Sequence, residues 1–407
     1  MRTPAPTPTA VSDNVLAGLP LAGRRILVNA LAAKAGGFRG FTIAFAHELQ
    51  RCADGASYLI LLPAETAAAV GPAHEHVRVV AARTLAGRPW LRTLWEQAGL
   101  PLAARRWGAD TIVSGSSYGP ALPGRRHVVW LRNGLPFSPE YEALVARDAG
   151  ERRRLVRARW QVGLSTRNAW RVLVQQEAMI GRVRRYLAIP PERFWVVPNA
   201  PLPPAGEVRP HVARLRVAHP GAFVVNGCQY YHRYRNVETL LDAAERVASE
   251  VPDLLLLLAV DPREEGEHSV RFVARLTASP LARAGQLVNF GRLSSAEMHA
   301  LYRLSDVAVF PSLAESFSNA YLDALTAGCA IAASDLDFAR GVFGEAALYF
   351  DPRDARALAQ LLAVLRREPA LIEQSRARAR ARVTEFSWER TRRAFLAAIS
   401  ERCAPKA

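Results

Sequence analysis

Lysine is almost absent from this chain of 407 residues, since it occurs only at Lys34 and Lys406. A phosphate-binding P-loop needs the sequence Gly-Lys-Ser/Thr, and neither lysine has those neighbours. A pyridoxal phosphate enzyme needs a core lysine that forms a Schiff base, whereas Lys34 lies in a glycine-rich segment and Lys406 in the terminal tail. The sequence therefore disfavours both enzyme classes.

Cysteine pairs and long apolar runs are also missing. The four cysteines are scattered and form no Cys-x-x-Cys pair, which argues against a disulfide framework or a zinc site and favours a reducing cytoplasm. The longest apolar run, residues 254–260, is far shorter than the ~20 residues that cross a bilayer and is typical of a buried strand. Residues 1–18 have no apolar core like that of a signal peptide, so we expect a flexible leader over residues 1–22.

Acidic residues are in the minority: 37 Asp and Glu stand against 53 Lys and Arg, for a net charge of +16. Nearly all of the cations are arginine, so one explanation of this excess is codon bias in a GC-rich genome. The functional alternative is attraction to anionic lipids, nucleotides or acidic glycans, for which the arginine-rich segments 151–159 and 182–186 supply a surface. We expect a cytoplasmic protein with a peripheral place at the inner face of the membrane, and no nucleic acid partner.

The length of the chain predicts two domains of roughly 200 residues each. In both halves short apolar runs alternate with helical patterns, which is typical of an α/β fold with parallel sheets. We place the first domain at residues 23–204, the second at residues 205–385, and a C-terminal helix at residues 386–407 that crosses back to the first domain. Ligands of such sheets bind at the carboxyl ends of the strands, so we expect the active site in the cleft between the domains.

The segment AESFSNAYLDAL, residues 314–325, contains two acids eight positions apart. It follows an apolar strand pattern and predicts a turn at residues 316–319 and then a helix that stops at Gly328. The free N–H groups of such a helix start bind phosphate. Eight residues at ~100° each leave Glu315 and Asp323 about 80° apart, so they form no close dyad but are suited to two parts of one extended ligand. The alternative is that they are ordinary acids favoured by the helix dipole.

Residues 310–352, which begin FPSLAESFSNAYLDAL and end EAALYFDP, resemble the donor-binding segment of the retaining family 4 (group 1) glycosyltransferases. The resemblance extends in family order over VVPNAP (196–201), NVETLLDA (236–243), residues 289–306 and FSWERT (386–391). It implies the GT-B fold, in which two Rossmann-like, doubly wound parallel-sheet domains face each other across a cleft. It also implies a nucleotide-sugar-dependent enzyme.

The resemblance assigns roles to the residues of the second domain. Glu315 matches the first glutamate of the family's Glu-x7-Glu, which contacts the donor sugar, and is our candidate catalytic residue. Asp323 takes the place of the second glutamate, which contacts the ribose, and is one methylene shorter. Residues 226–236 lack the family's first arginine, near which Gln229 stands, but Arg235 occupies the position of the following lysine. The remaining donor-binding candidates are Ser316, Phe317, Ser318 and Asn319, with His232 and Arg233 as alternative phosphate ligands.

The first domain contributes two candidate sites by the same resemblance. Gly36 and Gly37 match the family's glycine loop, where the absence of a Cβ lets the backbone approach the phosphates. Asn133, in WLRNGLPF, matches a cleft position on the acceptor side, although Asn-Gly is also a strong turn signal.

Two acidic or histidine-rich motifs suggest metal sites, which we do not expect. The sequence DLD, residues 335–337, has the Asp-x-Asp form of metal-dependent glycosyltransferases, but the resemblance places an ordinary loop there. The sequence HEH, residues 74–76, lacks a third ligand at helical spacing. We therefore expect no metal and no cofactor other than the nucleotide sugar as co-substrate.

The interpretation that follows is a retaining, metal-independent glycosyltransferase that moves a sugar from a nucleotide diphosphate to an acceptor hydroxyl. A glycan or a lipid-linked molecule is the expected acceptor, in exopolysaccharide or cell-envelope assembly. Two alternatives stay open. One is a nucleotide-sugar epimerase of the same fold, for which the sequence offers no convincing acid–base pair. The other is a non-catalytic nucleotide-sugar-binding partner of a glycosyltransferase, which Asp323 and the missing arginine favour.

Overall fold

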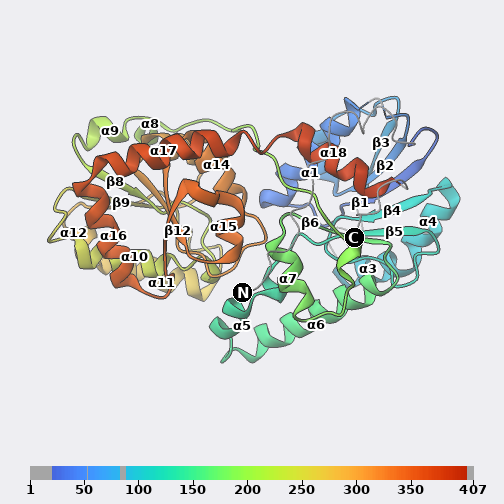
Figure 1. Ribbon diagram of the computed structural model, residues 1–407, viewed down its shortest axis with the longest axis horizontal. Coiled ribbons are helices and arrows are strands. Elements are labelled where there is room, and N and C mark those ends of the chain that lie inside the picture. The colour runs from blue at the N-terminus through green and yellow to red at the C-terminus, as the bar shows by residue number, and fades with distance from the viewer. Residues whose placement is uncertain (1–20, 53, 83–88, 401–407) are drawn as a thin grey trace, which may run out of the picture.

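The computed structural model describes residues 21–52, 54–82 and 89–400. These residues form two lobes, each built on one parallel sheet with helices on both faces (Figure 1). The N-terminal sheet has seven strands in the order β3-β2-β1-β4-β5-β6-β7, and the C-terminal sheet has six in the order β10-β9-β8-β11-β12-β13. The predicted α/β class with two doubly wound sheets is confirmed.

The strands are short, and most are buried on both faces. Strand β9, with the sequence LLLLL, is buried at every position. Parallel sheets covered by helices on both sides produce such continuous apolar runs. The strand bounds are β1 Arg25–Asn29, β2 Ser57–Leu62, β3 Val77–Ala81, β4 Thr111–Ser114, β5 Arg126–Trp130, β6 Arg171–Val174, β7 Phe194–Val196, β8 Phe223–Asn226, β9 Leu254–Leu258, β10 Leu287–Asn289, β11 Val307–Phe310, β12 Ala330–Ser334 and β13 Ala347–Phe350.

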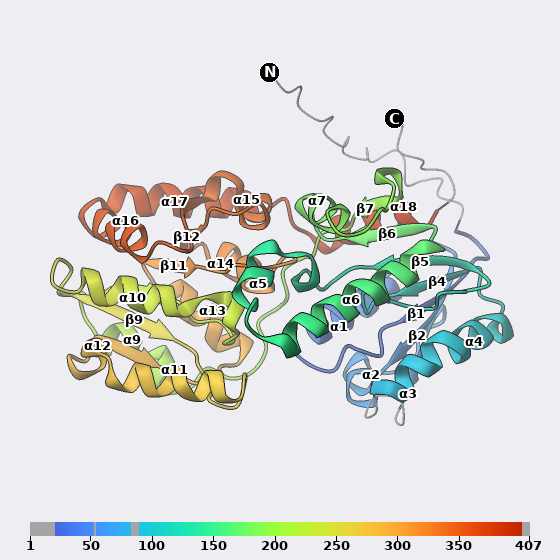
Figure 2. The ribbon, with the colours of Figure 1, turned by 90° about the horizontal axis from the view of Figure 1, so that it is seen from below.

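Helices connect the strands and cover the sheets (Figure 2). The helices of the N-terminal half are α1 Gly36–Gln50, α2 Ala64–Val70, α3 Pro89–Leu94, α4 Leu100–Trp107, α5 Pro139–Leu144, α6 Ala149–Arg167 and α7 Ala178–Arg184, with shorter turns η2 Trp95–Gly99, η3 Leu135–Phe137 and η4 Pro191–Arg193. Those of the C-terminal half are α8 Pro210–Ala213, α9 Leu215–Ala218, α10 Val237–Val247, α11 Glu267–Ala278, α12 Pro280–Arg283, α13 Ser295–Leu304, α14 Asn319–Ala327, α15 Asp337–Phe343, α16 Ala355–Arg367, α17 Pro369–Val383 and α18 Trp388–Ile399, with turns η5 Arg233–Arg235 and η6 Gly344–Ala346.

Several elements differ from the sequence pattern. The segment 35–38, which reads as a glycine loop, contains the first residues of α1. The patterns at 152–163 and 166–170 predict two helical pieces, but one helix, α6, runs without a break from Ala149 to Arg167, and residues 168–170 lead from it into β6. Residues 375–403 predict one long helical tail, whereas residues 384–387 break it and Ser387 caps the new helix α18. Strand β3 and helices α2 to α4 are short, with five to eight residues each, and the sequence interpretation did not include them.

Helix α18 lies on the N-terminal domain, far from the helix that precedes it in the chain (Figure 1). Phe395 packs edge-on against Phe45 of α1, with ring centroids 4.9 Å apart, and stacks on Trp130 at 5.6 Å. At the start of the helix, the indole N–H of Trp388 donates to the Pro201 carbonyl at 2.9 Å. The chain therefore crosses between the domains twice, and α18 holds the two crossings together.

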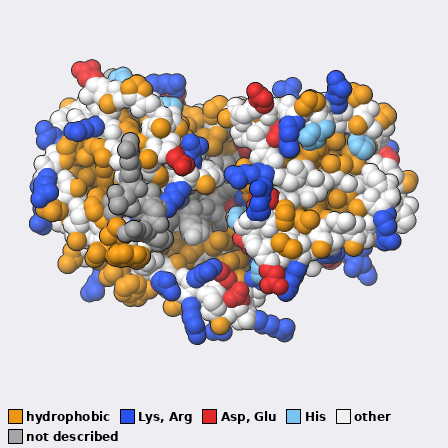
Figure 3. All heavy atoms as spheres, turned by 180° about the vertical axis from the view of Figure 1, so that it is seen from behind, with side chains coloured by type: hydrophobic (Ala, Val, Ile, Leu, Met, Phe, Trp, Pro, Cys, Tyr) orange, Lys and Arg blue, Asp and Glu red, His pale blue; other side chains and the backbone are white. Residues whose placement is uncertain are grey.

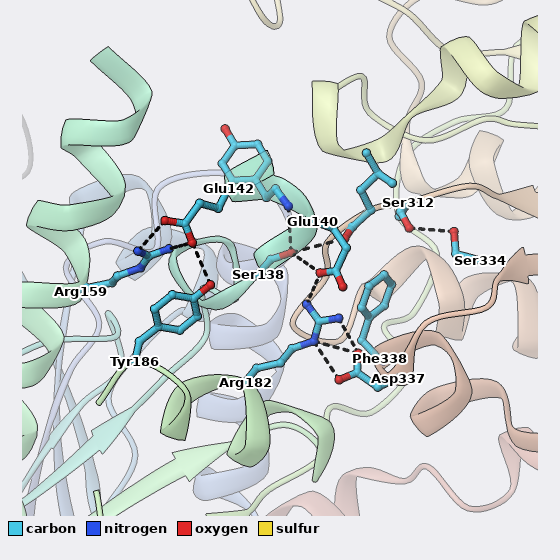
Figure 4. Close-up of polar contacts among 12 residues, drawn as sticks. Ser138, Glu140, Glu142, Arg159, Arg182, Tyr186, Ser312, Ser334, Asp337 and Phe338 are labelled. Atoms are coloured by element: carbon cyan, nitrogen blue, oxygen red, sulfur yellow. Dashed lines mark hydrogen bonds and ion pairs between the residues drawn. The ribbon is translucent and has the colours of Figure 1, made fainter. Parts of the chain in front are cut away.

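A polar network also joins the two domains away from the sheets (Figure 4). Arg182 of α7 donates to Glu140 of α5 at 2.9 Å and forms an ion pair with Asp337, the first residue of α15, at 2.6 Å. The Arg182 side chain is only 8% exposed, so both carboxylates compensate a buried charge. Ser138 donates to the Leu313 carbonyl in the opposite domain at 3.4 Å. These contacts connect α7 to the start of α15, and the start of α5 to the loop that leads into α14.

Candidate functional site

A cavity of about 920 Å³ lies between the domains. Its N-terminal wall is the exposed face of α1 together with the loop after β5, and its C-terminal wall comes from η5, α13 and the start of α14. The linker residues 202–205 close one side. Basic side chains are spread over both lobes and lie at the boundary between them (Figure 3). A cavity of this size, bounded by strand ends of two parallel sheets, suits a nucleotide-sized ligand.

The loop between β11 and α14 presents the motif that the sequence singled out. Strand β11 ends at Phe310, and α14 begins at Asn319. The residue before the helix, Ser318, has a positive φ of 67° and its side chain makes no capping hydrogen bond. The first N–H groups of the helix are therefore free of a side-chain cap and carry the positive end of the helix dipole. Ser316, Phe317, Ser318 and Asn319 all line the cavity.

Glu315 lies in this loop and faces Arg235 across the cavity wall. Its carboxylate is 3.7 Å from the Arg235 guanidinium, and their side chains are 8% and 13% exposed. Burial raises the pKa of Glu315, while the positive charge of Arg235 acts in the opposite direction. Gln229 accepts a hydrogen bond from Arg235 at 2.7 Å and so occupies the other side of that guanidinium. The pair leaves one buried Glu315 oxygen, Oε1, without a hydrogen-bond partner.

Asp323 lies one turn into α14 and lines the same cavity as Glu315. Burial raises the pKa of Asp323 to about 7, and no basic partner lowers it. The two acids therefore border one cavity in different electrostatic surroundings, with Glu315 beside an arginine and Asp323 without one. This arrangement agrees with two contact points on an extended ligand rather than a carboxylate dyad.

Gly36 and Gly37 form the start of α1, directly opposite the start of α14. Asn319 donates from its side-chain amide to the Gly37 carbonyl at 3.2 Å. A Cβ on Gly37 would lie 2.7 Å from the Asn319 Nδ2, so only glycine allows this approach without movement. The residue before α1, Ala35, provides no side-chain cap either. Two uncapped helix N-termini thus meet across the cavity.

Three of the predicted site residues do not reach the cavity. Asn133 is exposed, and its side-chain oxygen accepts the Leu135 N–H at 3.1 Å, as expected for an Asn-Gly turn. The Nδ1 atom of His232 lies 2.5 Å from a carboxylate oxygen of Glu265, and Arg233 lies 3.7 Å from Asp148 of the N-terminal domain. All three are absent from the cavity wall, because these partners hold the side chains outside it.

Arg132, which the sequence interpretation passed over, lines the cavity in place of Asn133. Its guanidinium lies 3.7 Å from the Phe41 ring centroid and donates to the Asn199 side chain at 3.2 Å. The sequence signal was the arginine beside Asn133 at the end of a strand pattern. Strand β5 ends at Trp130, and whether Arg132 or Asn133 faces the cleft depends on how the following loop turns, which the sequence does not reveal.

Backbone strain collects around this site. In the described part of the chain, three non-glycine residues have positive φ, namely Ser117, Asn236 and Ser318. Ser117 accepts the backbone N–H of Arg132 at 2.9 Å, Asn236 follows Arg235 and Ser318 follows the Glu315 loop. Each such conformation costs of order 1–3 kcal/mol and persists only where the surroundings impose it. The strain here positions residues that line the cavity.

The two suspected metal motifs make other contacts. Asp335 pairs with Arg340 and Asp337 with Arg182, so each carboxylate of DLD has its own arginine. His74 and His76 contact each other through their rings. In residues 21–52, 54–82 and 89–400 no group of three or more His, Cys, Asp or Glu side chains is arranged to hold a metal. No helix within those ranges is long and apolar enough to span a membrane.

The fold belongs to the class of two-domain GT-B proteins. The chain resembles the Anabaena protein Alr3699/HepE in complex with UDP-glucose, with a TM-score of 0.66 and 18% identity over 91% of this chain and 98% of that one. It also resembles sucrose-phosphate synthase from Thermosynechococcus elongatus, with a TM-score of 0.68 and 18% identity over 91% and 96% of the two chains. At this identity the likeness establishes the shared fold.

The second domain contains the match to a known family. Residues 222–367 match the family described as Glycosyl transferases group 1. A stretch of 160 residues is 28% identical to the serotype-specific mannosyltransferase WbdA of Escherichia coli. The match covers 39% of this chain and 19% of that protein, so the chain corresponds to about a fifth of its relative. The resemblance to group 1 glycosyltransferases of the GT-B fold is confirmed.

Proposed function

We propose that the protein is a glycosyltransferase that transfers a sugar from a nucleotide diphosphate to an acceptor hydroxyl. The observation that carries this proposal is the convergence of Glu315, Arg235 and the start of α14 on one interdomain cavity. In the reaction, the bond between the anomeric carbon and the β-phosphate oxygen breaks, a bond to the acceptor oxygen forms, and the proton of the acceptor hydroxyl passes to the leaving diphosphate. Negative charge develops on the leaving diphosphate, and preorganised cations and N–H groups stabilise it.

The roles of the donor-binding residues follow from their positions. Arg235 and the uncapped starts of α1 and α14 supply positive potential for the diphosphate. Glu315, whose free oxygen is buried beside Arg235, accepts hydrogen bonds from sugar hydroxyls and orients the anomeric carbon. Asp323 accepts hydrogen bonds from the ribose hydroxyls one helical turn away. The reaction proposed is metal-independent, because arginine and helix N-termini take the part of a cation, and it retains anomeric configuration, as in the family that the motif resembles.

We further propose that α6 holds the protein on an anionic membrane where a glycan or lipid-linked acceptor is presented. One face of α6 forms a shallow hollow lined by Ala149, Arg152, Arg153, Val156, Arg157 and Trp160. Val156 and Trp160 are 61% and 65% exposed, and the three arginines around them are exposed. Tryptophan favours the boundary between headgroups and acyl chains, and arginine is attracted to anionic headgroups. Such a surface suits polysaccharide assembly at the inner face of the membrane.

Donor binding and turnover test the proposed enzyme directly. The purified chain is titrated with UDP-glucose and GDP-mannose as probes, and slow hydrolysis of each donor is followed by release of the nucleoside diphosphate. We expect saturable binding and hydrolysis of at least one nucleotide sugar. Binding without any turnover, with or without cell-envelope glycan as acceptor, supports the non-catalytic partner, and failure of both probes to bind contradicts the donor site.

Glu315→Ala tests the central residue. The substitution is expected to abolish transfer while circular dichroism and the thermal midpoint show a folded protein, because it removes the group that orients the sugar. Glu238→Gln is the matched control, since Glu238 is partly buried and accepts the Tyr231 hydroxyl outside the cavity. Its rate should remain within twofold of the unmodified protein. An unchanged rate in Glu315→Ala would refute the assignment of Glu315.

A further inference from the structure

Arg132 carries a buried positive charge that no carboxylate balances. The guanidinium packs against Phe41, Trp130 and Phe38, with ring centroids 3.7, 5.2 and 5.3 Å away. No acidic side chain of the described residues forms an ion pair with it, whereas the other arginine discussed in the N-terminal domain, Arg182, has two. Burial lowers the pKa of Arg132 to about 9, so the group stays charged at neutral pH. A buried charge without a partner is costly and marks a functional position.

The hydrogen bonds of Arg132 place it beside the start of α14. One guanidinium nitrogen, Nη2, donates to Asn199, whose own amide donates to the Asn319 side chain at 3.1 Å. The other, Nη1, is buried and has no hydrogen-bond partner in the described part of the chain. The Arg132 carbonyl accepts the Ser316 hydroxyl at 2.9 Å, which ties the loop after β5 to the loop before α14. Arg132 therefore joins the two facing helix starts as a third positive group.

The distribution of charge over the cavity wall favours an anion at this point. In the C-terminal domain, the residue beside Arg235 is the neutral Gln229 rather than a second cation. Arg235 is therefore the arginine that this domain contributes next to Glu315. The remaining cavity cations are Lys34 and Arg39 on the α1 side and Arg292 on the α13 side. The cavity acids are Glu65, Glu315 and Asp323. Arg132 is connected to the start of α14 through Asn199, which receives its hydrogen bond and donates in turn to Asn319.

We propose that Arg132 binds the diphosphate of the nucleotide sugar from the N-terminal domain and stabilises the charge of the leaving group. The inference rests on the proposed function and adds a residue to its site. Its free Nη1 donates to a phosphate oxygen, and the Asn199 and Asn319 amides hold the guanidinium in position. Arg132 and Arg235 belong to different domains, so the diphosphate contacts both arginines only when the two domains face each other. Binding of the donor thereby stabilises the closed arrangement.

Variants of Arg132 separate this role from simple packing. Arg132→Met keeps the apolar contact with the aromatic rings and removes the charge, and Arg132→Lys keeps the charge without the planar fork. The control is Arg159→Met, since Arg159 also packs on a ring, at 3.9 Å from the Tyr186 centroid, but is paired with Glu142 outside the cavity. For each variant, dissociation constants are measured for UDP and GDP and, by NMR titration, for uridine and guanosine. The turnover of donor hydrolysis is measured as well.

We expect Arg132→Met to weaken binding of the nucleoside diphosphate by about 10- to 100-fold, as for loss of a charged hydrogen bond, while nucleoside affinity stays within twofold. Turnover should fall by about 100- to 1,000-fold, since leaving-group stabilisation is lost. Arg132→Lys should lie between these values, and it carries the test alone if the methionine variant does not fold. Arg159→Met should match the unmodified protein.

Three results would overturn the inference. An equal loss of diphosphate and nucleoside affinity means that Arg132 acts through packing. Unchanged diphosphate binding with a raised KM for the acceptor assigns Arg132 to an anionic acceptor instead. If the unmodified protein binds neither UDP nor GDP, the donor site itself is wrong, and the proposed function fails together with this inference. The first two results leave the proposed function intact.

Discussion

At the scale of single residues, side chains of the same charge in this site differ in the groups that surround them. Glu315 and Asp323 line one cavity, yet Arg235 stands beside the first and no cation beside the second. Arg132 and Arg235 are both half-buried and each has a buried guanidinium nitrogen, but only Arg235 has a carboxylate partner. A charged group that lacks a partner in the free protein can gain one from a bound ligand. We therefore expect donor binding to affect the protonation and hydrogen bonding of Asp323 and Arg132 more than those of Glu315 and Arg235.

Asp323 predicts a pH dependence of nucleotide binding. Its pKa is about 7 in the free protein, and an ionised carboxylate is the better acceptor for ribose hydroxyls. Below pH 7 a proton must leave before binding, so affinity for the nucleoside diphosphate should fall about tenfold between pH 8 and pH 6. Asp323→Asn should bind more weakly at pH 8 and should lose the pH dependence caused by Asp323, so that only the titration of the ligand's own terminal phosphate, with a pKa of about 6, remains. Calorimetric titrations of both proteins at four pH values provide the comparison, and parallel profiles would contradict the role of Asp323.

The same group affects stability with a definite sign. Because the folded-state pKa is raised above the unfolded value of about 3.9, the folded protein holds this proton more tightly. The contribution of Asp323 therefore lowers the free energy of unfolding of the free protein as pH rises from about 4 to 7. Above pH 7 this contribution no longer changes. Asp323→Asn removes this contribution, so it should gain thermal stability relative to the unmodified protein as pH increases toward 8. All other titrating groups are common to both proteins and cancel in the difference.

At the scale of elements, the proposed donor site is built mainly from the N-terminal ends of two helices. Helices α1 and α14 point uncapped N-termini at one place, and Gly37 permits their contact. By contrast, Ser294 and Asp354 cap α13 and α16 through their side chains, and α13 has a complete capping box. The missing caps leave the first N–H groups of α1 and α14 free for a ligand, although α10 and α17, which lie away from the cavity, also begin without a side-chain cap.

Helix α6 predicts binding to anionic lipid. The protein should sediment with vesicles that contain phosphatidylglycerol, should remain in solution with pure phosphatidylcholine, and should be released by high salt. Replacement of Arg152, Arg153 or Arg157 by Gln is expected to lower the vesicle partition coefficient about fivefold for each residue, because each basic residue contributes about 1 kcal/mol of attraction to an anionic surface. Trp160→Ser should also weaken binding, because the exposed indole is lost from the interface.

Trp90→Ser is the matched control for this surface. Trp90 is 67% exposed, close to the 65% of Trp160, and lies on α3 of the same domain. It should leave vesicle binding unchanged if α6 is the membrane face. Equal losses in Trp90→Ser and Trp160→Ser would show that exposed aromatics bind lipid without regard to position, and this would contradict the proposal.

At the scale of the whole molecule, the site exists only while two domains face each other. Arg132, Gly37 and Asn199 come from one side, and Glu315 and Asn319 from the other. The Arg182 network and helix α18 hold this arrangement away from the chemistry (Figure 4). A substitution that loosens the arrangement of the two domains is therefore expected to change donor binding even when the substituted residue does not line the cavity.

The DLD segment offers a matched pair of variants for this idea. Asp337 and Asp335 are 48% and 47% exposed, but Asp337 pairs with Arg182 of the opposite domain and Asp335 with Arg340 of its own. Asp337→Asn should broaden the distribution of sizes in small-angle X-ray scattering of the free protein and raise the donor KM several-fold. Asp335→Asn should change neither quantity. Equal behaviour of the two variants would mean that the Arg182 ion pair does not hold the domains together.

The sequence predicted most of the architecture because its signals are local. Continuous apolar runs such as residues 254–258 and the motif at residues 314–325 indicated the buried strands and the start of α14, including its end at Gly328. Short, weakly periodic elements such as β3 and α2 were missed, since few residues carry their pattern. The break at residues 384–387 was also missed, because the arginine-rich helical composition continues on both sides of it.

The sequence by itself determined the fold class, the two parallel sheets and the helix start that carries Glu315 and Asp323, since these depend on periodicity and on residues near each other in the chain. Only the tertiary structure decided which side chains share the cavity. It excluded His232 and Arg233, whose partners Glu265 and Asp148 are distant in sequence, and it turned Arg132 rather than Asn133 toward the cleft. The physical reason is that charge compensation and burial depend on contacts across the domain boundary, which no local pattern contains.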